Sequence, residues 1–72
     1  MDYEQISCSL FDRIESLAVA KKIVEIKYII NEIQSDAVKG FIKNVFSENK
    51  AEYLLINDVK IRLDKIKSIT EL

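Results

Sequence analysis

Hydrophobic residues change their spacing once along the chain, near residue 22. Before that point they recur at intervals of three and four, at Leu10, Ile14, Leu17 and Ala18. This spacing places them along one stripe of an α-helix, with Phe11 at the edge of the stripe. The pattern therefore predicts an amphipathic helix over residues 9–21.

Polar residues near position 10 suggest where that helix begins. Ser9 directly precedes the apolar stripe, and a serine hydroxyl is a good acceptor for the unpaired N–H groups of a first helical turn. With Ser9 as N-cap, Asp12 occupies the N3 position of a weak capping box. Glu15 lies one turn beyond Phe11 and too far along the helix for any capping role.

From residue 22 onward the apolar spacing is two, which is typical of β-strands. The predicted strands cover about 22–30, 37–46, 53–56, 59–63 and 66–69. Gly40 falls inside the second strand and predicts a bend or bulge there. Asn57-Asp58 fits a tight hairpin between the third and fourth strands.

Five short strands from about fifty residues indicate a small, strongly bent sheet that closes towards a barrel. The expected fold is α+β, mainly β: a single domain over 1–72, with an extended segment (1–8), the helix (9–21) and a five-stranded antiparallel β-barrel (22–72). Ile23 and Ile29 fall on the second face of the first strand. They are either a dimer surface or a second core layer beneath the helix, and the sequence leaves both alternatives open.

Composition agrees with one small folded domain. The chain has 72 residues, of which 49% are hydrophobic, with one Gly and no Pro, so disorder is not expected. No apolar run approaches the roughly 18 residues that a membrane span needs. The acidic N-terminus lacks the apolar stretch of a signal peptide. We therefore expect a cytoplasmic protein that does not bind membranes.

The residue types leave little room for catalysis. Cys8 is the only cysteine and there is no histidine, so an internal disulfide and a Cys/His zinc site are both excluded. The commonest general base near neutral pH is missing, and no glycine-rich loop is present to hold phosphates. Asp12 and Glu15 lie three residues apart, but on a solvated flank. We expect no enzymatic activity, cofactor or metal.

Charge is distributed unevenly along the chain. Residues 1–20 carry four carboxylates and one arginine, a net charge of −3, whereas residues 21–72 carry ten basic and eight acidic side chains, a net charge of +2. This acidic N-terminal part of the chain favours binding to a basic protein surface over binding to the phosphate backbone of a nucleic acid. The alternative is that these charges only keep the protein soluble and bind no partner. The lysines of the strands alternate with acids, without an aromatic cluster, so direct nucleic-acid binding is not favoured.

Several short motifs resemble the Rho-binding antiterminator family, called Rof. The opening matches at Tyr3, Ile6, Cys8, Asp12 and Glu15. The β-rich half matches at Glu52-Tyr53-Leu54, at Ile61-Arg62-Leu63-Asp64-Lys65-Ile66 and at Ser68. The matches follow the family's order over nearly the whole chain. Gln5 stands where that family usually has proline, and Phe11 stands where it has tyrosine.

The resemblance implies a fold and a function. It implies a helix packed on an Sm-like β-barrel, in a protein that binds the transcription termination factor Rho and obstructs its N-terminal RNA-binding region. Separately from the resemblance, we expect a monomer. Carried over by position, the contact residues are Ser9, Phe11, Asp12 and Glu15. Two alternatives remain open: an Sm-like module that binds RNA or forms a ring, and an interaction protein with an unrelated target.

Overall fold

The computed structural model describes residues 6–72, which form one helix and six strands. In chain order these are α1 (Cys8–Ala20), β1 (Val24–Ile29), β2 (Ser35–Gly40), β3 (Ile42–Glu48), β4 (Ala51–Ile56), β5 (Val59–Arg62), a 3₁₀ turn (Leu63–Lys65) and β6 (Ile66–Glu71). The predicted α+β class with mainly β structure is confirmed. The predicted extended segment lies outside the described residues over 1–5, and its last residue, Cys8, already belongs to α1.

The helix begins earlier than the sequence predicted. Ser7, and not Ser9, is the N-cap, and its Oγ accepts a hydrogen bond from the backbone N–H of Leu10 at 3.2 Å. Asp12 is then the fifth helical residue, and the first turn contains no acidic side chain. The predicted capping box is therefore wrong. Lys21 ends the helix in the left-handed conformation, close to the predicted end.

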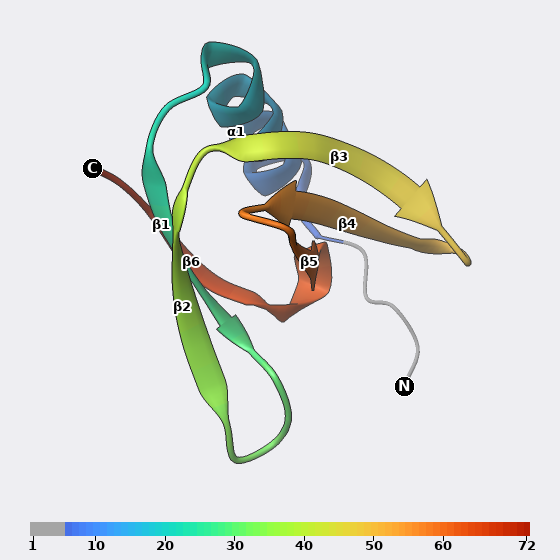
Figure 1. The fold of residues 1–72 in the computed structure, drawn as a ribbon. Coiled ribbons are helices and arrows are strands. Elements are labelled where there is room, and N and C mark those ends of the chain that lie inside the picture. Colours follow the sequence, from blue (N-terminus) through green and yellow to red (C-terminus); the bar gives the residue numbers. More distant parts are fainter. Residues whose placement is uncertain (1–5) are drawn as a thin grey trace.

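The strands form two three-stranded antiparallel sheets (Figure 1). In the first sheet β1 lies between β2 and β6, and in the second sheet β4 lies between β3 and β5. β2 runs almost directly into β3, so a single bent stretch of chain passes from one sheet to the other (Figure 1). Residues 6–72 show no closed barrel, because the two sheets are not hydrogen-bonded into one.

Gly40 explains why six strands appear where five were predicted. It lies at the bend between β2 and β3 with φ of 156°, a conformation that side chains rarely adopt. An added Cβ would lie 2.6 Å from Oδ1 of Asn57. The Asn57 side chain also donates a hydrogen bond to the Lys39 carbonyl. The expectation of a bend at Gly40 is confirmed, and the bend divides the predicted second strand in two.

Two tight turns connect the strands of the second sheet. Asn57 and Asp58 both have positive φ, of 48° and 64°, as the two-residue turn between β4 and β5 requires. The prediction of a hairpin there is confirmed. Asn49 and Lys50 form the β3–β4 turn in the same way, with φ of 50° and 63°. The strands predicted over 37–46 and 53–56 therefore end and begin too far from each other, because β3 extends to Glu48 and β4 begins at Ala51.

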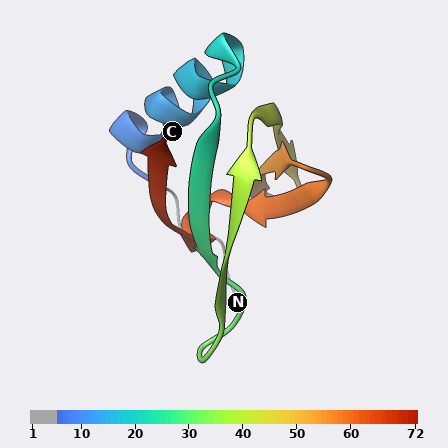
Figure 2. The same ribbon diagram turned by 60° about the vertical axis from the view of Figure 1, so that its left-hand side comes forward.

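The core lies between the helix and the two sheets. Its buried side chains come from α1, from the 3₁₀ turn and from every strand except β2, and comprise Ile14, Leu17, Val24, Ile26, Ile42, Leu54, Ile56, Ile61, Leu63 and Ile69. The helix crosses the sheets near the start of β1 and the end of β6 (Figure 2). Arg13 fixes this arrangement, since its Nη2 donates a hydrogen bond to the Ile69 carbonyl at 3.0 Å.

Ile23 and Ile29 do not form a second core layer. Their side chains are 49% and 38% exposed, and neither belongs to the buried cluster. The core-layer alternative is wrong because the buried residues of β1 are Val24 and Ile26, which lie on the other face of the strand. The helix packs its Ile14 and Leu17 side chains onto that face. The dimer-surface alternative stays a prediction.

Candidate partner-binding site

The outer flank of α1 borders a hollow of about 210 Å³. It is lined by Ile6, Cys8, Phe11, Asp12 and Glu52. Four of these residues come from the beginning of the helix and the two residues before it, and Glu52 comes from β4. The structure therefore brings two predicted site residues, Phe11 and Asp12, next to a second carboxylate that lies forty residues further along the chain.

Phe11 has two roles in this arrangement. Its side chain is partly buried and packs against the core, which agrees with the interpretation of Phe11 as core rim. The same side chain lines the hollow. Because one part of the ring is held by the core, the part that faces the hollow is fixed in place. A fixed aromatic ring loses little conformational freedom when a partner covers it.

Asp12 has no structural task at the helix N-terminus. It lies beyond the first turn, where capping and the helix dipole act, and it is exposed. The prediction that Asp12 takes part in capping the helix is therefore wrong. Its carboxylate is a surface charge that lines the same hollow as Phe11.

Glu15 and Ser9 are not part of the same hollow. Glu15 is exposed and lines a neighbouring hollow of about 250 Å³ between α1 and β3, together with Val19 and Lys43. The Lys43 ammonium group lies 3.5 Å from the Asp58 carboxylate. Ser9 is the second helical residue; it is exposed and lines neither hollow. The four predicted contact residues thus share one end of the molecule but not one site.

Glu52 is the site residue that sequence reasoning missed. It is half-buried on β4, opposite Ser47 in the register with β3. The resemblance includes it in the Glu52-Tyr53-Leu54 motif, but nothing in the local sequence links it to the helix. Its position beside Asp12 depends on how α1 packs against the second sheet.

The chemistry of the hollow suits a cationic side chain with an apolar stem. Ile6 and the Phe11 ring supply apolar surface, while Asp12 and Glu52 supply carboxylates. Carboxylates form short, charge-assisted hydrogen bonds with guanidinium and ammonium groups. An aromatic ring attracts the same cations through its face. The hollow is therefore matched to an arginine or lysine of a partner.

An aromatic pair does accompany the lysines, contrary to the sequence interpretation. Phe46 and Tyr53 are cross-strand neighbours with stacked rings, whose centroids are 5.7 Å apart. The Lys60 ammonium lies 4.7 Å from the Tyr53 centroid and 3.4 Å from a Glu48 carboxylate oxygen. Tyr53 therefore interacts with a neighbour on each adjacent strand, with Phe46 on β3 and with Lys60 on β5.

Other chemistry is sparse in the part of the chain that the structure describes. Cys8 is an exposed free thiol. Within 6–72 no group of three His, Cys, Asp or Glu side chains is placed to hold a metal ion. Within the same range no helix has the length and apolar character needed to cross a membrane.

Comparisons of this chain with protein-family models, with curated proteins and with solved structures gave no match.

Proposed function

We propose that this protein is a non-catalytic inhibitor of Rho-dependent transcription termination. In this proposal it binds the N-terminal RNA-binding region of Rho through the outer flank of α1 and prevents Rho from engaging RNA. The observation that carries the proposal is the hollow at the start of α1, which is lined by the exposed Asp12 carboxylate and by the Phe11 ring that packs against the core. A surface that binds RNA phosphates is basic, and this site is its complement.

The proposal includes an Sm-like arrangement of the strands. Three features support it: an N-terminal helix, a long bent stretch (β2 and β3) shared between two antiparallel sheets, and a short 3₁₀ turn between the last two strands. This arrangement leaves the start of α1 and β4 side by side at the proposed contact surface.

The test is a titration of the purified full chain into the N-terminal RNA-binding region of Rho, with and without a pyrimidine-rich RNA. We expect binding that competes with RNA. The Asp12→Lys/Glu15→Lys double variant reverses two surface charges without touching the core, and we expect it to abolish binding. Glu52→Gln tests the added carboxylate, and we expect binding about tenfold weaker.

A matched control variant distinguishes an effect of the α1 site from an effect of the protein's net charge. Glu32→Lys/Asp36→Lys makes the same change in net charge at exposed positions on and beside the β1–β2 turn, and we expect it to bind Rho normally. Equal loss in both double variants would mean that net charge, and not the α1 flank, governs binding. No binding by the folded unmodified chain would refute the proposal, and direct binding to the RNA would favour the RNA-binding alternative.

A further inference from the structure

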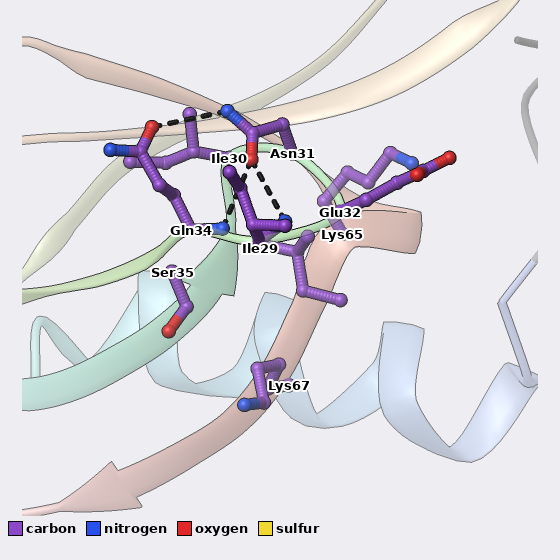
Figure 3. Close-up of a pocket in the computed structure, with 9 residues that line it drawn as sticks. Ile29, Ile30, Asn31, Glu32, Gln34, Ser35, Lys65 and Lys67 are labelled. Carbon is purple, nitrogen blue, oxygen red and sulfur yellow. Dashed lines mark hydrogen bonds between the residues drawn. The ribbon is translucent and has the colours of Figure 1, made fainter.

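We draw no further inference here: the strongest candidate, the apolar hollow at the β1–β2 turn that is lined by Ile29, Ile30 and Ile33 (Figure 3), carries no proposal because nothing in the structure shows what covers it.

Discussion

Asp64 is held by a bidentate ion pair with Arg62. Arg62 Nε and Nη2 donate to its two carboxylate oxygens, each at 2.7 Å, and the Asp64 side chain is only 6% exposed. This two-point contact joins the end of β5 to the 3₁₀ turn, where the chain passes from the second sheet back to the first. An enclosed, bidentate pair contributes more than a surface pair because solvent screens it less.

Loss of the Asp64 charge should therefore destabilise the protein clearly. We expect Asp64→Asn to lower the free energy of unfolding by about 2 to 3 kcal/mol, since the Arg62 guanidinium, 20% exposed, loses its bidentate, charge-assisted contact with this carboxylate. Urea denaturation measures this. Glu48→Gln is the control: its pair with Lys60 is about half exposed, so we expect a loss below about 1 kcal/mol. Similar losses for the two variants would contradict this explanation.

Gly40 shows how one residue sets the path of two strands. We expect Gly40→Ala to cost about 1 to 3 kcal/mol, because φ is strained for alanine and the new Cβ meets the Asn57 side chain. Thermal unfolding followed by circular dichroism measures the loss. Repeating the change in an Asn57→Gly background removes the contact and keeps the strain. A cost that vanishes entirely in that background would show that strain contributes nothing.

Individual site residues differ in how far the sequence could predict them. Phe11 and Asp12 follow from helical spacing and from the resemblance, since both lie near α1's N-terminus whichever serine caps it. Glu52 could not be located in this way. Its place beside Asp12 results from packing between elements forty residues apart, which no local pattern encodes.

The start of α1 illustrates why element boundaries are hard to predict. Ser7 and Ser9 are equally good capping residues, and the choice between them comes from their apolar neighbours. With Ser7 as N-cap, Ile6 precedes the cap and Phe11 is the fourth helical residue, the two positions of a hydrophobic staple. Both side chains pack against the core. With Ser9 as N-cap the same positions hold Cys8 and Arg13, which cannot form a staple.

The two serines should respond differently to truncation. We expect Ser7→Ala to lower the free energy of unfolding by about 1 kcal/mol, because the Leu10 N–H loses its acceptor. Ser9→Ala should change it by no more than about 0.5 kcal/mol, in the stabilising direction, since alanine favours helix interiors. Chemical denaturation of both variants measures the difference. A larger loss for Ser9→Ala would restore Ser9 as the cap.

The helix and the sheets form one packed unit. Ile14 is fully buried within a cluster that includes residues from both sheets. The Arg13 side chain joins α1 to β6, and the Leu72 N–H donates to the Ile23 carbonyl at 2.9 Å, which fastens the end of the chain beside the start of β1. A domain of this size has little stability in reserve, so loss of a central contact should affect all of it.

Ile14→Ala tests this cooperativity. We expect a loss of about 2 to 5 kcal/mol, because the change opens a cavity where helix and sheets meet. Helical circular dichroism and tyrosine fluorescence should be lost together in one transition. Val19→Ala, at a helical position 84% exposed, should have little effect on stability. Separate transitions for the two signals would show that α1 is an appendage of an independently stable β-domain.

The sequence by itself determined the fold class, the place of the helix, the bend at Gly40 and the Asn57-Asp58 turn. These features depend on local spacing and on the backbone preferences of single residues, which neighbours along the chain are enough to reveal. The tertiary structure decided the number of strands, the division into two sheets and the meeting of Phe11, Asp12 and Glu52. These depend on which apolar faces pack together, and that packing is settled by the whole chain at once.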